Sequence, residues 1–211
     1  MSSCLQRLFY IYSMPDALII FVRNPELGKV KTRLAQTIGQ EKALNIYKQL
    51  LQHTLDITKN LAVDKYVFYT DKIPEKDMWK DAGYYRLLQK DAGLGEKMHH
   101  SFKILFEKKY RKVVIVGSDC IELTEDIILN AFHSLQDHDA VIGPANDGGY
   151  YLLGMKKLYP DFFINKKWST EDVYETTIKD FNKLELKYFM LPVLIDVDTE
   201  QDWKLANKKN N

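Results

Sequence analysis

The sequence predicts an α/β protein: a three-layer α/β/α sandwich with a mostly parallel central sheet. Short apolar runs typical of buried strands alternate along the chain with longer segments of helical periodicity. The strongest run is Val113–Val116, four consecutive β-branched residues, which is typical of a central strand covered by helices on both faces. Ser118 and Asp119 follow it after one glycine. They are therefore expected at the carboxyl edge of the sheet, where open α/β sheets bind ligands.

Seven segments are predicted to be strands, because apolar, β-branched or aromatic residues dominate each of them between turn signals. They are residues 17–22, 65–70, 85–89, 113–116, 140–143, 150–153 and 187–191. The first is apolar throughout and ends before Pro25 and Gly28, which interrupt regular structure. The fifth and sixth are joined by a short loop with two adjacent glycines, Gly148 and Gly149, so a β-hairpin turn is a natural interpretation there.

Helices are predicted where apolar residues recur every three or four positions. The predicted helices begin near residues 40, 93, 124 and 170, and a short terminal helix follows residue 199. Thr124 precedes two acids, so its hydroxyl suits an N-cap with negative charge in the first turn. Ser169 or Thr170 is expected to cap the next helix, and Asp198 or Thr199 the terminal one.

Composition restricts the class of protein. With 211 residues, of which 45% are hydrophobic, the chain suits a single domain over residues 16–211, preceded by an N-terminal extension over residues 1–15. The 30 basic and 29 acidic residues nearly cancel, which argues against a nucleic-acid partner. No stretch is long and apolar enough to span a membrane. Cys4 and Cys120 give no disulfide framework, so a reduced, cytoplasmic protein is expected; the oligomeric state stays open.

A basic segment follows the first strand and is a candidate phosphate site. Arg23, Gly28, Lys31 and Arg33 lie within eleven residues of one another. Exposed backbone amides beside cationic side chains suit a nucleoside diphosphate. The segment has neither the phosphate-loop pattern ending in Gly-Lys-Ser/Thr nor the three-glycine dinucleotide pattern. A solvated basic loop is the alternative interpretation.

Acidic residues after predicted strands are candidate metal ligands. Asp196 and Asp198 alternate around one valine, so in an extended segment both carboxylates point to one side. Carboxylates on one face repel each other unless a cation or a basic group lies between them. Together with Asp119 they could form an oxygen-rich site for Mg²⁺ or Mn²⁺. The alternative is that one of them only caps the terminal helix.

The loop Asp147-Gly148-Gly149 is a candidate sugar or acceptor site. Adjacent glycines let a ligand approach the backbone closely, and Asp147 could bind a hydroxyl group. Tyr151 and Trp168 supply aromatic faces that suit a sugar or a flat acceptor, although each could equally be a core residue. We expect Asp147 and Trp168 to border the same pocket as Asp119, on the side away from Lys31.

The order of these motifs resembles a bacterial family of candidate glycosyltransferases with the glycosyltransferase-A fold, of the kind associated with arsenosugar biosynthesis. The similar segments are residues 21–25, 28, 31–34, 93–98, 117–120, 143–154, 168–170 and 196–199. They span roughly residues 16–205, nearly the whole chain. The chain departs from the family at Ile121, where proline is usual, which affects the rigidity of the loop more than its chemistry.

The resemblance implies a nucleotide-diphospho-sugar transferase-like fold, shared with the molybdenum-cofactor and phospholactate guanylyltransferases. It implies catalytic roles for Asp119 and Asp147, and metal binding by Asp119 with Asp196 or Asp198. Nucleotide binding is expected at Arg23, Gly28, Lys31, Arg33 and Ser118. Sugar or acceptor binding is expected at Asp147, Gly148, Gly149, Tyr151, Trp168 and Thr170.

The expected activity is that of a transferase dependent on Mg²⁺ or Mn²⁺. A glycosyltransferase with a nucleotide-sugar donor and a small-molecule acceptor is the leading hypothesis. Two alternatives remain: a guanylyltransferase-like nucleotidyltransferase that uses a nucleoside triphosphate and releases pyrophosphate, and a nucleotide-sugar-binding protein without turnover. The same cations and acids would serve both transfer reactions, so the sequence separates them poorly.

Overall fold

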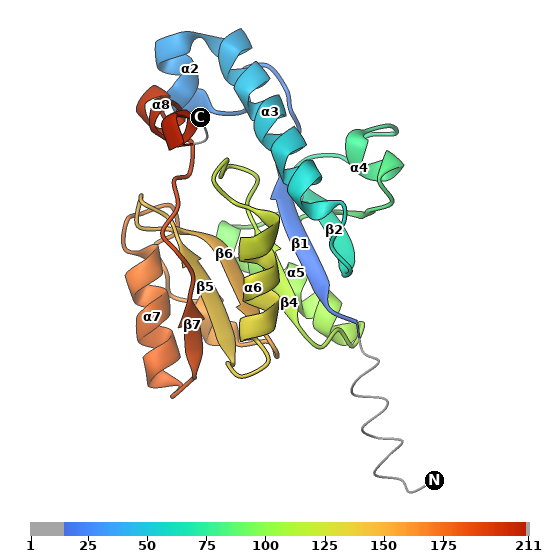
Figure 1. The fold of residues 1–211 in the computed structure, drawn as a ribbon, viewed down its shortest axis with the longest axis vertical. Coiled ribbons are helices and arrows are strands. Elements are labelled where there is room, and N and C mark those ends of the chain that lie inside the picture. Colours follow the sequence, from blue (N-terminus) through green and yellow to red (C-terminus); the bar gives the residue numbers. More distant parts are fainter. Residues whose placement is uncertain (1–14, 210–211) are drawn as a thin grey trace, which may run out of the picture.

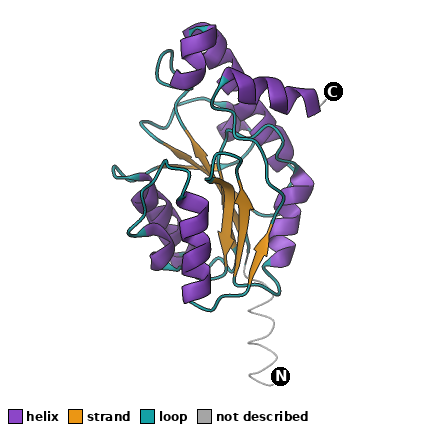
Figure 2. Cartoon of the chain, turned by 90° about the vertical axis from the view of Figure 1, so that its left-hand side faces the viewer, coloured by secondary structure: helices purple, strands orange, loops and turns teal. Residues whose placement is uncertain are grey.

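The computed structural model describes residues 15–209. A single seven-stranded sheet in the order β3-β2-β1-β4-β6-β5-β7 forms its centre. The strands are β1 (Ala17–Val22), β2 (Asp64–Tyr69), β3 (Tyr85–Leu88), β4 (Val113–Val116), β5 (Ala140–Pro144), β6 (Tyr150–Met155) and β7 (Tyr188–Met190). All strands run in one direction except β6, which is antiparallel to both of its neighbours. The predicted three-layer sandwich with a mostly parallel sheet is confirmed (Figures 1 and 2).

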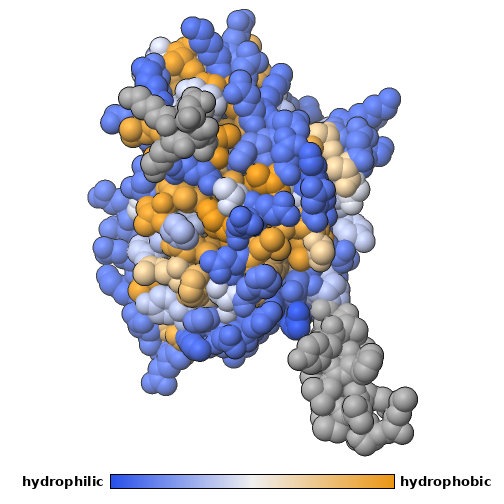
Figure 3. Space-filling model, viewed as in Figure 1, coloured by the Kyte–Doolittle hydropathy of each residue, from blue (hydrophilic) through white to orange (hydrophobic). Residues whose placement is uncertain are grey.

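Helices cover both faces of the sheet. They are α2 (Thr32–Ile38), α3 (Gln40–Thr58), α4 (Met78–Asp81), α5 (Leu94–Glu107), α6 (Glu125–Ser134), α7 (Val173–Lys183) and α8 (Glu200–Lys209), with a 3₁₀ helix η1 (Pro160–Phe163). Helices α3 and α6 pack against one face, and α5, η1 and α7 against the other. Figure 3 shows hydrophilic residues around the rim of the α3–α6 face and hydrophobic residues towards its middle.

The central strands are buried on both faces because their side chains alternate between two cores. On β1, Leu18 and Ile20 join the core under α3 and α6, whereas Ala17 and Ile19 join the core under α5 and α7. This alternation explains why the central strands are continuous apolar runs. A third cluster joins α2, α3 and α8 beyond the carboxyl edge of the sheet, through residues such as Leu34 and Val197.

Two local predictions are wrong. No helix was predicted at α2, so Arg33 belongs to a helix and not to a loop, and Lys31 is the residue that precedes this helix. Ser169 and Thr170 do not cap α7, whose N-cap is Asp172. They lie in a tight turn instead, in which Ser169 has φ of 63° and the Thr170 hydroxyl donates to the carbonyl of Lys167 at 2.7 Å.

Other caps agree with the sequence. The Thr124 hydroxyl accepts a hydrogen bond from the Ile127 amide at 3.3 Å, as predicted. At α8, Thr199 and Asp202 bond each other's backbone amides, the reciprocal pattern of a capping box. Of the two predicted alternatives, Thr199 is therefore the cap of α8. The Asp198 carboxylate contacts Lys31 instead.

The predicted N-terminal extension lies outside the described residues, apart from Pro15. Within the described residues, none of the helices has both the length and the apolar character that crossing a membrane requires.

Candidate functional site

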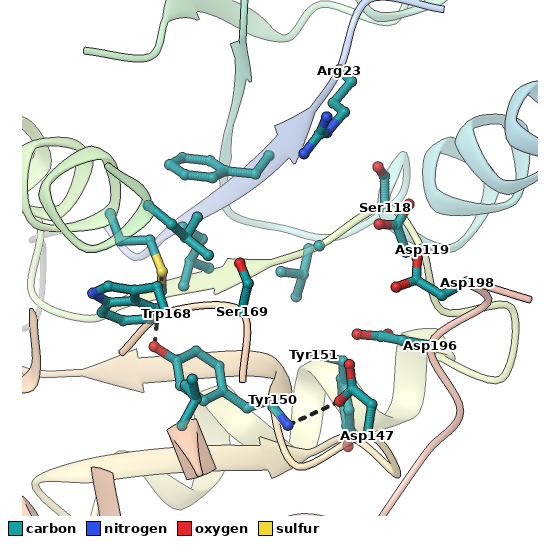
Figure 4. A pocket seen from close by; sticks show the side chains of 18 of the residues that line it. Arg23, Ser118, Asp119, Asp147, Tyr150, Tyr151, Trp168, Ser169, Asp196 and Asp198 are labelled. Carbon is teal, nitrogen blue, oxygen red and sulfur yellow. Dashed lines mark hydrogen bonds between the residues drawn. The ribbon is translucent and has the colours of Figure 1, made fainter. Parts of the chain in front are cut away.

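A cavity of about 690 Å³ opens at the carboxyl edge of the sheet. It is bordered by the ends of β1 and β4, the start of β6 and the loop of residues 165–172 that precedes α7. Most of the predicted site residues line it: Arg23, Arg33, Ser118, Asp119, Asp147, Gly149, Tyr151, Trp168, Thr170, Asp196 and Asp198. Gly28, Lys31 and Gly148 are not among the residues that line it. The expectation that Asp119, Asp147 and Trp168 border one pocket agrees with this geometry (Figure 4).

The loops after β1 and β4 are held together by a tyrosine that the sequence did not single out. The Tyr47 hydroxyl accepts a hydrogen bond from the Arg23 amide at 2.8 Å and donates to the Arg23 carbonyl at 3.1 Å. It also lies 3.4 Å from the Ser118 hydroxyl. Burial raises the pKa of Tyr47, so the phenol stays neutral at physiological pH. Tyr47 therefore fixes Arg23 and Ser118 at the wall of the cavity.

Lys31 connects two of the candidate metal ligands. Its ammonium Nζ lies 3.0 Å from Oδ1 of Asp119 and 3.4 Å from Oδ1 of Asp198, and its side chain is only 4% exposed. Arg33 contacts the second oxygen of the Asp198 carboxylate, with Nη2 at 3.6 Å from Oδ2. The Val197 amide donates to the Asp119 carbonyl at 2.9 Å, which fixes the chain before α8 beside the loop after β4. The cation expected to face a phosphate is thus enclosed by acids.

Asp196 lies next to this ion-pair cluster and has an unusual proton affinity. Burial, followed by the negative charges of Asp119 and Asp147, raises the pKa of Asp196 to about 7, although the nearby Lys31 opposes the shift. The carboxyl borders the cavity on one side. Near neutral pH a substantial fraction of Asp196 is therefore protonated.

The acids fit a divalent cation in chemistry, but only partly in arrangement. Carboxylate oxygens are the donors that Mg²⁺ and Mn²⁺ prefer, and Asp119 and Asp198 approach each other closely enough to share one ammonium. Among residues 15–209, however, no three His, Cys, Asp or Glu side chains are grouped as metal ligands would be. The predicted three-carboxylate site thus stays a prediction, and the pair Asp119 and Asp198 is its best-placed part.

Asp147 lies in the turn of the β5–β6 hairpin. Its Oδ1 accepts a hydrogen bond from the Gly149 amide at 2.9 Å, which holds the turn, and Figure 4 shows the carboxylate on the Asp196 side of the cavity. Gly148 has φ of +84°, and a Cβ there would lie 2.1 Å from the Glu171 carbonyl oxygen. The turn therefore has two roles. It connects β5 to β6 as the predicted hairpin turn, and it packs against the loop that precedes α7 at the edge of the cavity.

The part of the cavity away from the acids is aromatic and apolar. We call Leu94, Lys97, Met98, Tyr150 and Trp168 the aromatic end, and Arg23, Arg33, Ser118, Asp119, Asp196 and Asp198 the charged end. Figure 4 shows Trp168 and Tyr150 across the cavity from Asp119 and Asp198. The Tyr150 hydroxyl donates to the sulfur of Met98 at 3.8 Å.

A glycine makes room for the aromatic end. A Cβ at Gly95, in the first turn of α5, would lie 2.3 Å from the indole nitrogen of Trp168. Lys97 and Met98 also line the cavity, although the sequence had not singled them out as site residues. Tyr151 borders the cavity, but its hydroxyl proton is donated to the Pro192 carbonyl at 3.0 Å, so the hydroxyl could only accept a hydrogen bond from a ligand.

Comparisons with other proteins agree with this architecture. Residues 54–170 match the family model DUF2064, described as an uncharacterised protein conserved in bacteria. The chain is 34% identical to a candidate nucleotide-diphospho-sugar transferase from Desulfovibrio desulfuricans G20, over 93% of this chain and 87% of that one, with a TM-score of 0.87. The chain matches no curated protein.

Two more distant structures share the fold. The 4-diphosphocytidyl-2C-methyl-D-erythritol synthase of Anaerococcus prevotii DSM 20548 is 14% identical, over 95% of this chain and 97% of that one, with a TM-score of 0.61. Glucosyl-3-phosphoglycerate synthase of Mycobacterium tuberculosis, in complex with Mn²⁺ and UDP, is 11% identical, over 94% of this chain and 77% of that one, with a TM-score of 0.56. At these identities the similarity concerns the fold alone.

Proposed function

The chain belongs to the DUF2064 family of bacterial proteins, and we propose that it is a transferase whose donor is a nucleotide sugar. The observation that carries the proposal is the division of one cavity into a charged end and an aromatic end. A nucleotide sugar has the same division, because an anionic diphosphate separates two ring systems. The relative that is 34% identical is itself a candidate nucleotide-diphospho-sugar transferase, which supports the same donor class.

The charged end would receive the diphosphate. Arg23 lines the cavity after β1, and Arg33 does so from the first turn of α2. Both guanidiniums can donate charge-assisted hydrogen bonds to phosphate oxygens, and bidentate Arg–phosphate contacts are among the stronger polar interactions. These groups stand where negative charge develops as the diphosphate departs, so their stabilisation increases towards the transition state.

Asp119 and Asp198 would hold Mg²⁺ or Mn²⁺, with Asp196 as a further ligand after it loses its proton. When bound, such a cation neutralises the departing diphosphate. The proposal draws support from the carboxylate chemistry of the pair and from the Mn²⁺ found with UDP in the distant glucosyl-3-phosphoglycerate synthase.

The aromatic end would hold the sugar or the acceptor against Trp168 and Tyr150, since aromatic faces suit the apolar faces of sugars and flat rings. In the proposed reaction an acceptor hydroxyl attacks the anomeric carbon. The bond between that carbon and the diphosphate oxygen breaks, and its electron pair leaves with the nucleoside diphosphate. Asp147 is the candidate to take the hydroxyl proton, because its carboxylate borders the cavity, on the Asp196 side.

Nucleotidyl transfer is the second candidate, favoured by one observation. Arg23, Lys31 and Arg33 place three cations near the end of β1, which could balance a triphosphate as well as a diphosphate. In that reaction an acceptor phosphate oxygen attacks the α-phosphorus of a nucleoside triphosphate and pyrophosphate leaves. The 4-diphosphocytidyl-2C-methyl-D-erythritol synthase that shares the fold is consistent with this candidate.

The test is an incubation of the purified protein with Mn²⁺, an acceptor extract, and either radiolabelled nucleotide sugars or radiolabelled nucleoside triphosphates. Release of a nucleoside diphosphate from a sugar donor is the expected result. Release of pyrophosphate from a triphosphate, without turnover of any sugar donor, would replace the proposal by the second candidate. Nucleotide-sugar binding without any turnover would favour the non-catalytic binding protein.

A further inference from the structure

The ammonium of Lys31 occupies the space between Asp119 and Asp198, the two acids that would hold a divalent cation. We propose that Lys31 couples nucleotide binding to metal binding: its ammonium is the internal counter-ion of the two acids, and it turns to the nucleotide's phosphates when the metal takes its place. This inference rests on the proposed function and deepens it, since it concerns how the same site is loaded.

The geometry makes Lys31 and a metal compete for the same oxygens. The ammonium lies 3.0 Å from Asp119 Oδ1 and 3.4 Å from Asp198 Oδ1. A divalent cation needs oxygen ligands at about 2.0–2.6 Å, so its positive charge would stand only a few ångströms from Lys31. Like charges at that separation repel strongly in a partly enclosed site. A metal that binds both acids through these same Oδ1 atoms therefore requires the ammonium to move.

The exposure of the three side chains indicates from which side each cation reaches the carboxylates. Lys31 is 4% exposed, whereas Asp119 and Asp198 are 42% and 40% exposed. Both acids line the cavity and Lys31 does not. A metal can thus reach the carboxylates from the cavity while Lys31 holds them from the protein side. The nucleotide would enter from the same cavity.

The backbone of Lys31 is fixed, so the side chain must make the movement. Lys31 has φ of 48° and ψ of 45°, and its carbonyl accepts the first hydrogen bond of α2, from the Ala35 amide at 2.8 Å. A left-handed conformation at a non-glycine residue costs free energy and is found at sites that the fold holds firmly. The four-carbon stem of lysine lets the ammonium change partner without any change in the backbone.

The exchange makes metal and nucleotide binding cooperative. Metal alone must displace Lys31, which then has no anionic partner. A nucleotide alone must draw Lys31 away from two carboxylates, which are then left unpaired. When both ligands bind, the metal replaces the ammonium on the acids and the phosphates replace the acids on Lys31. By thermodynamic linkage, each ligand then raises the affinity for the other by the same factor.

The coupling can be measured by binding alone. Free Mn²⁺ would be followed by electron paramagnetic resonance during titration of the 211-residue chain, without nucleotide and with UDP, GDP, CDP and ADP in turn. In the wild-type protein, a nucleotide that binds should raise Mn²⁺ affinity by about 5- to 150-fold, the usual range of coupling between two sites. Lys31→Met keeps the length of the side chain and removes its charge. It should bind Mn²⁺ more tightly than wild type without nucleotide, and its Mn²⁺ affinity should respond much less to nucleotide.

Two further variants control for charge and folding. Lys29 lies two residues away, pairs with Glu26 and has a side chain that is 65% exposed. Lys29→Met makes the same charge change without touching the acids, so its Mn²⁺ affinity should stay within about twofold of wild type. Lys31→Arg keeps a cation at the position and should retain weak Mn²⁺ binding without nucleotide; it carries the test if Lys31→Met does not fold.

The inference would be overturned if Lys31→Met bound Mn²⁺ no more tightly than wild type without nucleotide. Tight Mn²⁺ binding by Lys31→Arg without nucleotide would also overturn it. Failure of the proposed function has a different signature, because no nucleotide would then bind to any variant. Nucleotide binding that raises Mn²⁺ affinity equally in wild type and in Lys31→Met would leave the proposed function standing and remove the coupling role of Lys31.

Discussion

The two ends of the cavity are built by different physical means. At the charged end, residues up to 167 positions apart in the chain meet through ion pairs, and the key carboxylates remain about 40% exposed. At the aromatic end, Trp168 is placed by shape, because two glycines leave room for its loop where any Cβ would overlap neighbouring atoms. Substitutions at the charged end should therefore change binding and chemistry more than folding. Backbone changes at the aromatic end should change folding as well.

Asp119→Asn should have the largest effect on activity, because it disrupts the ion pairs of the charged end. The substitution removes a proposed metal ligand and one partner of Lys31 while preserving the size of the side chain. The transfer rate should fall by about 100- to 1000-fold, the scale of losing one electrostatic group at a reacting centre. The melting temperature, measured by circular dichroism, should change little.

Asp161→Asn is the matched control, since Asp161 pairs with an exposed lysine, Lys183, outside the cavity. It should leave the transfer rate unchanged. Equal rates for Asp119→Asn and wild type would show that Asp119 is structural.

Gly148→Ala should have the largest effect on stability. It should disrupt the packing of the loop of residues 165–172, which carries Trp168, against the β5–β6 hairpin. Gly148 has φ of +84°, and the new Cβ would lie 2.1 Å from the Glu171 carbonyl oxygen and 2.5 Å from the Glu171 Cα. Backbone atoms cannot yield easily, so we expect unfolding free energy to fall by about 2–4 kcal/mol in urea denaturation.

Gly149→Ala is the comparison, because its Cβ would meet only the Asp147 side chain, at 3.1 Å, and Gly149 has no positive φ. Its cost should be clearly smaller. Similar losses for the two variants would mean that the contact with Glu171 does not hold the loop.

Arg33→Ala and Trp168→Ala should sharpen the contrast between the ends. Arg33→Ala should weaken nucleoside diphosphate binding by about 1–3 kcal/mol, a lost charge-assisted hydrogen bond, and affect the bare nucleoside much less. Trp168→Ala should leave the binding of the nucleoside diphosphate nearly unaffected. It should weaken the binding of the nucleotide sugar by about 1–2 kcal/mol. Calorimetric titration of the three ligands measures both. If each variant weakened all three ligands equally, the division of the cavity would be wrong.

Asp196→Asn should have the smallest effect, and the effect should depend on pH. The folded-state pKa of Asp196 is raised to about 7, above the unfolded value near 4. The stability that this group contributes is therefore fully present below about pH 4 and is lost as pH rises through about 7. Asparagine imitates the protonated acid, so the variant should match wild type at about pH 4. At pH 8 it should be more stable by about 1–2 kcal/mol, a value reduced because the carboxyl borders the cavity.

Thermal unfolding at the two pH values, with a chelator present, measures this difference. Asp198→Asn is the control, since it loses the contact with Lys31 and should not gain stability at pH 8. A pH-independent effect of Asp196→Asn would contradict the raised pKa.

The sheet could be predicted well from the sequence, because a strand that is buried on both faces is a short continuous run of apolar residues. Val113–Val116 was predicted with the bounds that the structure has, and so was Ala17–Val22. Helix α2 was missed because it has only seven residues and a single buried side chain, Leu34, which is too short a stretch to show periodicity.

The site was only partly predictable, for reasons of distance. The acids and Arg33 could be recognised from their positions after strands and from the family resemblance. The enclosure of Lys31 depends on Asp198, which lies 167 positions away, so no local pattern reveals it. The Tyr47 hydroxyl was equally hidden, because an aromatic residue on the apolar side of a helix has the appearance of an ordinary core residue.

The proposed nucleotide site is tested most directly by calorimetric titration of the wild-type protein with a nucleoside diphosphate and with the matching nucleoside, in the presence of Mn²⁺. We expect one binding site and at least about tenfold tighter binding of the diphosphate, since charge-assisted bonds to the phosphates add about 1.4 kcal/mol or more. Raising the salt concentration should reduce this difference in affinity. Equal affinities for the two ligands, or no binding of either across the four common bases, would contradict it.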